Sequence, residues 1–305
     1  MDKIGKDLLE KVADLHEIPE GAYNIRENGG LGGRRTTANI DIITKVDKPG
    51  IDIIIKPNTK NESVHIPVII SKSGLDDLVY NDFYIGENAD IVIVAGCGIH
   101  NTGDEKSSHD GIHTFHVGKN AKIKYVERHY GAGNGLGTNV MNPTTIIKID
   151  DGGYMEMETT QIKGIDSTVR KTTASLGKES KLVIKESLMT HGKQYAKTDF
   201  TVDLNGENSS ANVISRSVAK DESYQEFLSI INGNNKCAGH TECDAIIMDK
   251  ARVCAIPQIT ANHIDASLIH EAAIGKIAGE QLMKLMTLGL TEEEAEEQIV
   301  NGFLK

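Results

Sequence analysis

A short pattern, made of an apolar residue, a small polar turn and an alternating strand, recurs along the middle of this chain. It is clearest from Ile85 to Ile93 and from Val117 to Tyr125, and looser copies begin at Ile149, Leu176 and Leu204. Successive copies start 32, 32, 27 and 28 residues apart. A period of about 30 residues, with short strands and no helix inside it, is typical of a β-solenoid, whose coils bury one another.

We therefore predict a mainly β fold, a right-handed β-helix (β-solenoid), with N-terminal and C-terminal helices. The β-helix core is expected over residues 38–270. The composition suits thin stacked layers, because aromatic residues make up only 4% of the chain and Trp is absent. Ile, Val, Leu and Ala must therefore fill the interior. A β-sandwich with evenly spaced hairpins is the alternative that the pattern leaves open.

The N-terminal segment, residues 1–37, is expected to contain one helix and a loop. Apolar residues recur with helical spacing from Lys3 to about His16. The glycine-rich residues 28–35 follow, and they lack a GxGxxG or Walker pattern between a strand and a helix. We therefore expect a loop there, not a phosphate-binding site.

The C-terminal region, residues 271–305, is expected to be helical. One helix should run from Gly279 to Leu288 and end at Gly289, a residue type that favours helix termination. Thr291 and Glu294 have the spacing of a capping box at the start of a last helix. Such helices can cover the open strand edges at the end of a solenoid.

The net charge of −11 argues against a nucleic-acid partner, since this field repels phosphate groups. The sequence has no run of 18 apolar residues, so no membrane span is expected, and its N-terminus lacks the apolar run of a signal peptide. We expect a cytoplasmic protein, in which the four cysteines are thiols and not disulfides.

Three of the four cysteines, Cys237, Cys243 and Cys254, fall within eighteen residues. Thiolates bind zinc and iron–sulfur clusters, but this spacing matches neither a zinc finger nor a ferredoxin. Such loose spacing fits ligands displayed on successive strands. Two alternatives remain open: each cysteine is a small buried residue, or Cys237 and Cys243, which polar neighbours place by a turn, form a redox relay.

The fourth cysteine, Cys97, lies between two glycines that leave room either for another group or for a thiol packed in a tight corner. His270 and Glu271 end the β region, and as neighbours on one strand they should point to opposite faces. Five more histidines lie near one another in the sequence without a carboxylate at ligand spacing. We expect these five on the surface: His100, His109, His113, His116 and His129.

The common catalytic motifs are missing from this sequence. It contains no Gly-x-Ser-x-Gly, His-Glu-x-x-His or P-loop pattern, so hydrolase and NTPase chemistry lack their usual residues. A solenoid enzyme acting on carbohydrate would need paired carboxylates along a groove, whereas the acidic residues here are scattered. We do not expect an enzyme.

Taken together, these segments resemble the SufB/SufD family, the scaffold subunits of the SUF iron–sulfur cluster assembly system. The resemblance covers about residues 85–305. His240-Thr241-Glu242-Cys243-Asp244 is similar to the SufB segment with the cysteine thought to hold the nascent cluster, and Gly96-Cys97 to the site proposed to receive sulfur. The clearest likeness is in the tail, at Ala266–Ala272, Gly275–Ile277, Glu280–Leu282, Gly289-Leu290 and Ile299–Phe303.

The resemblance implies a SufB-like short form, since SufD-type members usually lack the cluster cysteine. Cys243 would be the principal ligand of an iron–sulfur cluster, expected to be [4Fe–4S], with help from Glu271 and His270. Cys97 would relay sulfur. For this short chain we expect a ligand set of three cysteines and one carboxylate: Cys237, Cys243 and Cys254 with Glu242 or Glu271. Ile269 departs from the family, where an acidic residue often precedes His-Glu.

The resemblance also implies partners. A SufC-like ABC ATPase would dock on the C-terminal helices and supply the energy, because the chain has no ATP site of its own. A sulfur donor and either a second copy of this chain or a SufD-like paralogue would complete the assembly. The alternative within the same complex is a SufD-like structural subunit that holds no cluster itself.

Overall fold

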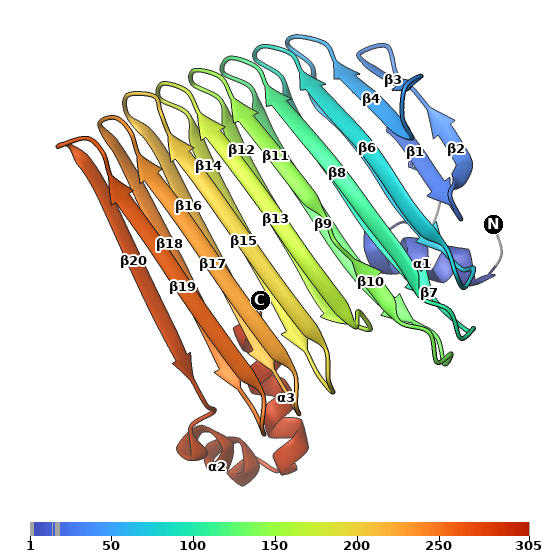
Figure 1. The fold of residues 1–305 in the computed structure, drawn as a ribbon, viewed down its shortest axis with the longest axis vertical. Helices are drawn as coiled ribbons and strands as arrows, with labels where there is room; N and C mark the ends of the chain where they lie inside the picture. The colour runs from blue at the N-terminus through green and yellow to red at the C-terminus, as the bar shows by residue number, and fades with distance from the viewer. Residues whose placement is uncertain (1–2, 14, 16–18, 305) are drawn as a thin grey trace.

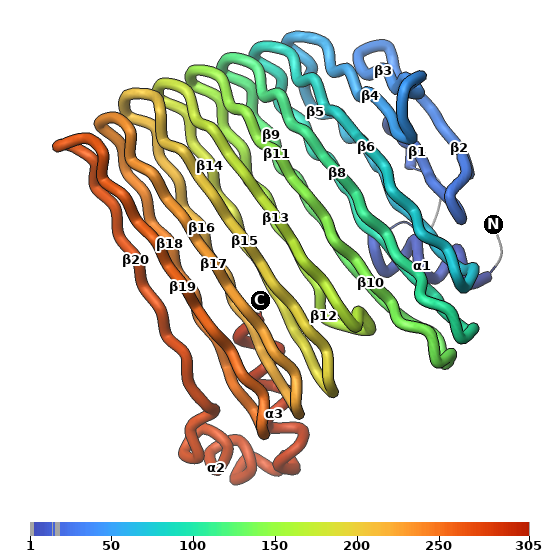
Figure 2. The backbone as a smooth tube through the Cα atoms, viewed as in Figure 1, coloured from blue at the N-terminus to red at the C-terminus, as the bar shows by residue number. Residues whose placement is uncertain are grey.

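The computed structural model describes the chain except for residues 1–2, 14, 16–18 and 305. It is mainly β, with two large sheets lying face to face and helices at both ends (Figures 1 and 2). Sheet A contains, in spatial order, β2 (Gly30–Arg35), β1 (Ala22–Glu27), β5 (Lys60–Ile70), β7 (Asp90–His100), β9 (Lys122–Ala132), β12 (Tyr154–Lys163), β14 (Lys181–Thr190), β16 (Ser209–Ala219), β18 (Cys237–Ile247) and β20 (Ala266–Gly275).

Sheet B contains β3 (Ile40–Thr44), β4 (Gly50–Ile55), β6 (Asp76–Ile85), β8 (Ser107–Val117), β10 (Asn139–Met141), β11 (Thr144–Ile149), β13 (Ser167–Leu176), β15 (Tyr195–Leu204), β17 (Tyr224–Gly233) and β19 (Arg252–Ala261). From β5 onward the chain alternates between the sheets, with β10 and β11 as two consecutive strands of sheet B, and neighbouring strands within each sheet are parallel. The expected β-solenoid is confirmed, and the β-sandwich alternative is wrong because a sandwich of hairpins would pair its strands antiparallel.

The repeat seen in the sequence corresponds to the stacking of coils in sheet B. Ile85 pairs with Val117, Val117 with Ile149, Ile149 with Leu176, and Leu176 with Leu204. The starts of the five copies therefore lie directly above one another. The varying period, between 27 and 32 residues, reflects turns of different length and leaves the register of the strands intact.

The turn after each of these strands contains one residue in the left-handed region of backbone conformation. Side chains that tolerate a positive φ, Asn and Gly above all, occupy most of these corners. Each such residue donates its backbone N–H to a carbonyl of the next coil, over 2.7–3.1 Å. The stacked corner residues are Asn88, Asn120, Gly152, Glu179 and Asn208.

The interior is apolar in one half of each coil and polar in the other. On β14, for example, Leu182 and Ile184 point inward near the strand start, and Glu186 points inward two residues later. The apolar halves stack into one continuous core from Ala22 to Cys243. Sequence periodicity alone does not distinguish the two halves, because both alternate with outward residues.

Helix α1 (Lys3–Ala13) packs against the outer face of sheet A, over β7. A Cβ at Gly96 would lie 2.7 Å from the carbonyl oxygen of Val12, and a Cβ at Gly98 would lie 3.0 Å from the side chain of Leu8. The two glycines beside Cys97 thus admit a helix. The expected helix end near His16 lies outside the described residues.

The glycine-rich residues 28–35 do not form the expected loop. Residues 30–35 are strand β2, which pairs antiparallel with β1 around a turn at Asn28 and Gly29. Backbone hydrogen bonds in a sheet require no particular side chain. A glycine-rich segment can therefore form an edge strand when the neighbouring strand, here β1, pairs with it. The strands consequently begin at Ala22, ahead of the expected limit of residue 38, and they continue to Gly275.

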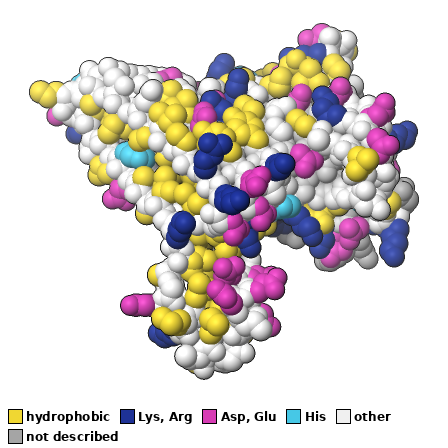
Figure 3. All heavy atoms as spheres, turned by 60° about the horizontal axis from the view of Figure 1, so that its bottom comes forward, with side chains coloured by type: hydrophobic (Ala, Val, Ile, Leu, Met, Phe, Trp, Pro, Cys, Tyr) yellow, Lys and Arg dark blue, Asp and Glu magenta, His cyan; other side chains and the backbone are white. Residues whose placement is uncertain are grey.

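At the other end, helices α2 (Gly279–Thr287) and α3 (Glu292–Phe303) follow β20, and the capping box of Thr291 with Glu294 is confirmed. Helix α3 packs on Val218 and Met248 through its own apolar residues. Helix α2 leaves large apolar side chains in solvent, and the two helices protrude from the solenoid in Figure 3 with hydrophobic and acidic side chains side by side. Among the described residues, no helix is long and apolar enough to cross a membrane.

Candidate functional site

Two adjacent strands at the C-terminal end of sheet A bring together several of the predicted site residues. Strand β18 pairs with β20, the last strand of the sheet, so that Glu242 lies beside Glu271 and Cys243 lies beside Ala272. His270 pairs with Thr241, one step along the strand. Strands in a sheet are about 4.8 Å apart, so Cys243 and His270 have Cα atoms about 8 Å apart on the same inner face.

The cysteines of β18 point into the solenoid. Cys237 and Cys243 both belong to the apolar core, and Cys243 is only 1% exposed. Burial, with smaller effects from Glu186 and Asp244, raises the pKa of the Cys243 thiol to about 12. Burial also raises the pKa of Cys237. Both thiols are therefore protonated at neutral pH, and Cys243 lies in mid-strand, away from the turn that the polar neighbours suggested.

Alternate residues between them, among them His240 and Glu242, point the other way, to the outer face of sheet A. There one ligand atom from each of His240, Glu242 and Glu271 lies within 4.8 Å of the other two. The Nε2 atom of His240 is 3.2 Å from Oε2 of Glu271, and its Nδ1 atom is 2.9 Å from Oδ1 of Asn212. One imidazole and two carboxylates at this spacing suit a divalent transition-metal ion, and the contact with Asn212 orients the ring as outer-shell partners do in metal sites.

The expected four-ligand set is not brought together by this fold. Cys237 and Cys243 are six residues apart on one continuous strand, which places their Cα atoms about 20 Å apart. Cys254 lies beside Glu226 on the outer face of sheet B, whereas both of the other cysteines face inward. A single cluster therefore cannot bind all three thiols while β18 remains intact.

Cys97 lies in the middle of β7, not at a corner, and its side chain points inward among apolar residues such as Val68 and Ile99. Burial raises the pKa of its thiol well above the ordinary value. It borders a small cavity of about 10 Å³, the space of about one water, which His109, His113 and His129 also line. Five strand spacings separate Cys97 from the level of Cys243, about 24 Å along the stack.

The expectation that the five histidines lie on the surface is wrong for three of them. His109, His113 and His129 are 6–7% exposed and face the interior. The carboxylate partner of His109 comes from another coil and so is invisible as a local motif: His109 Nδ1 is 3.1 Å from Asp77. The partner of His129 lies two residues away on the same strand, with His129 Nε2 3.7 Å from Glu127. The register of the solenoid creates the pair of His109 with Asp77, which are 32 residues apart, whereas alternation along β9 puts Glu127 and His129 on the same face.

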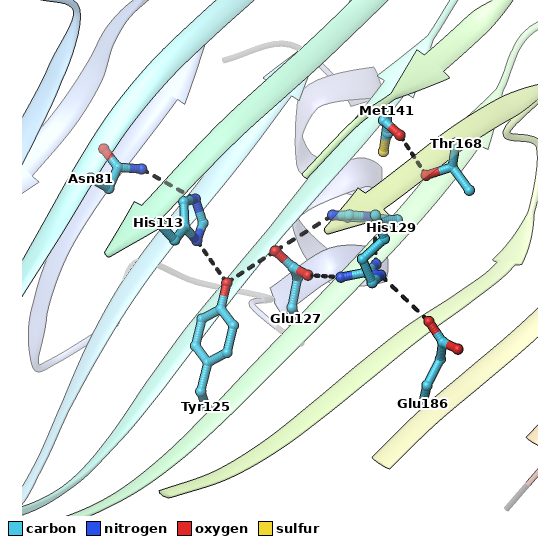
Figure 4. Close-up of polar contacts among 9 residues, drawn as sticks. Asn81, His113, Tyr125, Glu127, His129, Met141, Thr168 and Glu186 are labelled. Carbon is cyan, nitrogen blue, oxygen red and sulfur yellow. Dashed lines mark hydrogen bonds and ion pairs between the residues drawn. The ribbon is translucent and has the colours of Figure 1, made fainter. Parts of the chain in front are cut away.

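These histidines belong to a row of interior polar groups that crosses the coils, called the inner polar row below. Figure 4 shows its first part, from Asn81 through His113 and Tyr125 to Glu127. His113 Nδ1 is 2.8 Å from the hydroxyl of Tyr125, and that hydroxyl donates to Glu127 over 3.0 Å. Burial lowers the pKa of His113 to about 4, so its ring is neutral at pH 7.

Arg170 continues the inner polar row toward the C-terminal coils. Its guanidinium donates to Glu127 and lies 3.6 Å from Glu186. Glu186 in turn accepts hydrogen bonds from the hydroxyls of Thr198, at 2.9 Å, and Ser215, at 2.8 Å. Ser215 pairs with Cys243 on the neighbouring strand. The row thus extends from the surroundings of Cys97 to those of Cys243, through buried groups that all have partners.

Sequence reasoning missed His240, Glu127, Arg170 and Glu186. His240 was available as the residue two positions before Glu242, which puts both on one face of a strand. Glu127 was available in the same way, since it lies two positions before His129 on one strand. Arg170 and Glu186 carry no local signal, because a buried charge in a strand looks like any outward charge until its partner from another coil is known.

The sequence of this chain is similar to those of known proteins. A family model described as "SUF system FeS cluster assembly, SufBD core domain" matches residues 80–303. A protein named "Iron-sulfur cluster assembly SufBD family protein" from Methanothermobacter thermautotrophicus is 34% identical over 224 residues, which cover 72% of this chain and 53% of the relative. The chain thus matches only about half the length of that relative.

Two further relatives are similar to this chain. A protein of the same family name from Methanocaldococcus jannaschii is 30% identical over 256 residues, which cover 83% of this chain and 79% of the relative. The "Iron-sulfur cluster assembly protein SufB" of Bacillus subtilis is 37% identical over 102 residues, which cover 32% of this chain and 22% of the relative.

Proposed function

Because this chain belongs to the SufBD family of iron–sulfur cluster assembly proteins, we propose that it is a scaffold on which iron and sulfur are joined into a cluster. We place this assembly in the cytoplasm and expect the product to be a [4Fe–4S] cluster. The cluster and its iron are cargo, which the scaffold holds and passes on. The chain acts as a scaffold and not as an enzyme.

The observation that carries the proposal is the composition of the β18–β20 strand pair. It presents a thiol and an imidazole, Cys243 and His270, on the inner face, and the group of His240, Glu242 and Glu271 on the outer face. Thiolate, imidazole and carboxylate are the groups that bind iron in proteins. We assign the first iron to the outer group and the cluster to Cys243, with His270 and Glu271 as further ligands.

Cys243 and Glu271 face opposite sides of sheet A, so one cluster reaches both only if β20 moves. Strand β20 is suited to this movement, because it is the last strand of its sheet and has β18 as its one lateral partner among the described strands. Only residues 276–278 separate it from α2. A partner that pulls on the C-terminal helices therefore acts directly on the strand that covers Cys243.

We propose that this partner is a SufC-like ABC ATPase. Docking there is supported by the exposed apolar residues Met283 and Met286 of α2 and Leu288 at its C-cap, since such side chains gain by leaving water. Closure of the ATPase would then displace β20, expose the Cys243 thiol to water and let it ionise. This accounts for a thiol that the resting fold keeps protonated.

The end of the solenoid supports a second subunit in the assembly. Ile256 and Ile259 of β19 and Ile269 of β20 are 41–52% exposed beside strand edges that lack a neighbour in the described chain. Uncovered strand edges with apolar side chains are surfaces that proteins normally bury. We propose that a second copy of this chain, or a SufD-like paralogue, covers them.

Cys97 is proposed to receive sulfur from a donor. Direct contact with Cys243 is excluded by the separation of about 24 Å along the stack. The inner polar row is the part of the interior that connects the two thiols, and its buried carboxylates and hydroxyls favour polar over apolar cargo. A relay between the cysteines would therefore follow this row.

Anaerobic reconstitution with ferrous iron and sulfide, in the presence of the ATPase partner and ATP, tests the proposal. Thiolate-to-iron charge-transfer bands in the visible spectrum should appear with the wild type and be lost in Cys243→Ala. Cys97→Ala is the matched control, since free sulfide bypasses a relay. Cys237→Ala should also keep the bands, because β18 holds Cys237 about 20 Å from Cys243.

A SufD-like subunit that holds no cluster is the second candidate. The burial of Cys243 and its raised pKa favour it, because a protonated thiol does not bind iron. Full cluster formation by the Cys243→Ala variant, in complex with its partners, would decide for this candidate and against the first.

A further inference from the structure

A cavity of about 250 Å³ lies at the N-terminal mouth of the solenoid, between the first strands of sheets A and B. Its walls come from the β1–β2 hairpin, from the turn between β3 and β4, and from the inward faces of β5 and β6. This volume is just below the range of about 300–1,000 Å³ that is typical for pockets of drug-sized ligands, so it suits a smaller molecule. It lies almost entirely ahead of residue 80, where the match to the family model begins.

The charged side chains that line this cavity are all cationic: Arg26, Arg34, Lys45 and Lys48. Two of them, Arg26 and Lys45, are neutralised by carboxylates that do not line the cavity. Arg26 donates to both oxygens of Asp77, and Lys45 forms ion pairs with Asp52 and Asp82. The other two, Arg34 and Lys48, form no ion pair with any described residue.

Arg34 is held in place by neutral acceptors only. Its Nε atom donates to Oδ1 of Asn24 over 2.8 Å, and its Nη1 atom donates to the hydroxyl of Thr44 over 2.8 Å. Asn24 is buried, so the guanidinium is anchored without being neutralised. An oriented guanidinium with an unpaired charge is the group that binds carboxylate and phosphate oxygens best, because its planar N–H donors match their geometry.

Lys48 adds a second cation that forms no ion pair with any described residue, although it lies near enough to Asp82 to help lower the pKa of that carboxyl. Its Nζ atom lies 4.6 Å from the centroid of the Tyr80 ring, a contact that positions the ammonium group while leaving hydrogen-bond donors free. Two such cations around one small cavity, in a chain of net charge −11, indicate a local preference for anions that the molecule as a whole does not share.

We propose that this cavity binds a small anion, with Arg34 as the principal contact and Lys48 as the second. The cavity shares Ile66 and Val68 with the walls of the small cavity beside Cys97, so a bound anion lies next to the surroundings of that thiol. If the proposed function holds, the ligands used there would be hydrosulfide, which is an anion, and free cysteine, which would bind through its carboxylate. The anion site itself does not depend on cluster assembly.

Isothermal titration calorimetry of the full chain under anaerobic conditions tests the site. The probes are inorganic phosphate, L-cysteine and sodium hydrosulfide, which separate charge alone from a thiol with a carboxylate and from sulfide. Arg34→Gln should weaken binding of whichever probe binds the wild type by at least about tenfold, the equivalent of about 1.4 kcal/mol. Unchanged cluster reconstitution with free sulfide in this variant would keep the two proposals distinguishable.

Arg35→Gln is the matched control. Arg35 is the next residue, but its guanidinium donates to the carbonyls of Pro19 and Gly21 outside the cavity, so binding should stay within about twofold of the wild type. Lys48→Gln is the second test if Arg34→Gln fails to fold, and it should weaken the same probe. Failure of all three probes to bind the wild type, or equal effects of the Arg34 and Arg35 variants, would overturn the proposal.

Discussion

Replacing Arg170 by methionine tests whether the buried charges of the inner polar row stabilise the solenoid. Arg170 is 3% exposed and lies between two buried carboxylates, Glu127 and Glu186. Burial alone would raise the pKa of Glu127, but the charge of Arg170 helps to lower it well below the ordinary value. Methionine fills much of the same space without the charge, so burial should raise the pKa of Glu127 in the folded variant, against the remaining contact with His129, and favour its protonated form.

The cost follows from the pH. A glutamate has an ordinary pKa of about 4.3, and keeping it protonated costs about 1.4 kcal/mol for each pH unit above that value. Protonation of Glu127 should therefore lower the free energy of unfolding of the Arg170→Met variant by about 4 kcal/mol at pH 7 and by about 1 kcal/mol at pH 5. The loss at pH 7 agrees with the destabilisation of roughly 3–5 kcal/mol that is found when one partner of a buried ion pair is removed. Glu186 retains the hydroxyl donors of Thr198 and Ser215.

The sign of the pH dependence distinguishes this explanation from lost packing. In the wild type the lowered pKa of Glu127 contributes stability above the unfolded pKa, and this contribution is lost only as the pH falls through the folded value. In the variant the folded pKa is raised above the unfolded one. Its stability relative to the wild type should therefore increase as the pH falls from about 7 to about 5.

Urea unfolding followed by far-ultraviolet circular dichroism at both pH values measures these free energies. Arg252→Met is the control, because Arg252 is exposed and its guanidinium lies 5.2 Å from the centroid of the Tyr224 ring. The free energy of unfolding of this control should fall by less than about 1 kcal/mol at either pH. An equal loss in Arg170→Met at pH 5 and pH 7 would refute the reasoning.

Three further outcomes are expected. Glu179→Asn should raise the free energy of unfolding by about 1 kcal/mol in a thermal melt, because Glu179 has a φ of +55° at a corner where Asn is favoured, and a lower melting temperature would contradict this. Gly96→Ala should cost about 1–3 kcal/mol, since its Cβ would lie 2.6 Å from the Arg128 carbonyl oxygen, whereas Gly275→Ala meets no atom within 4 Å and should be tolerated. An aromatic disulfide reagent at neutral pH should label Cys254 first and Cys243 much later, and a fast phase that survives in Cys254→Ser would show this order to be wrong.

Much of the fold was predictable, because its signals are local. The copies of the sequence pattern begin at Ile85, Val117, Ile149 and Leu176, and these residues, each the last of its strand, stack in the register that their spacing indicates. The capping box of the last helix is likewise a pattern of four residues. The glycine-rich stretch was misjudged because a strand made of glycines depends on its partner strand, which no local pattern reveals.

The candidate site was only partly predictable. Cys243 and the His270-Glu271 pair are separated by about the length of one coil, so their closeness could be predicted, and the structure places them on the adjacent strands β18 and β20. The shared ligand set of Cys237, Cys243 and Cys254 did not follow, because residues six apart on a straight strand cannot meet. The resemblance to a family identified the residues, but it carried no information about which face of the sheet each one occupies.

The sequence by itself determined that this chain stacks short strands into coils, where those coils turn and how its last helix begins, since each depends on residues within a few positions of one another. Only the tertiary structure decided which side chains meet. It brings His240 to Glu271 and Arg170 to two carboxylates, and it places Arg34 beside a cavity without an ion-pair partner among the described residues. The physical reason is that stacking within a sheet joins residues 27 to 32 positions apart, while packing across the interior joins Arg170 of sheet B to carboxylates of sheet A. A change of one position in the register of a strand would turn its side chains to the opposite face.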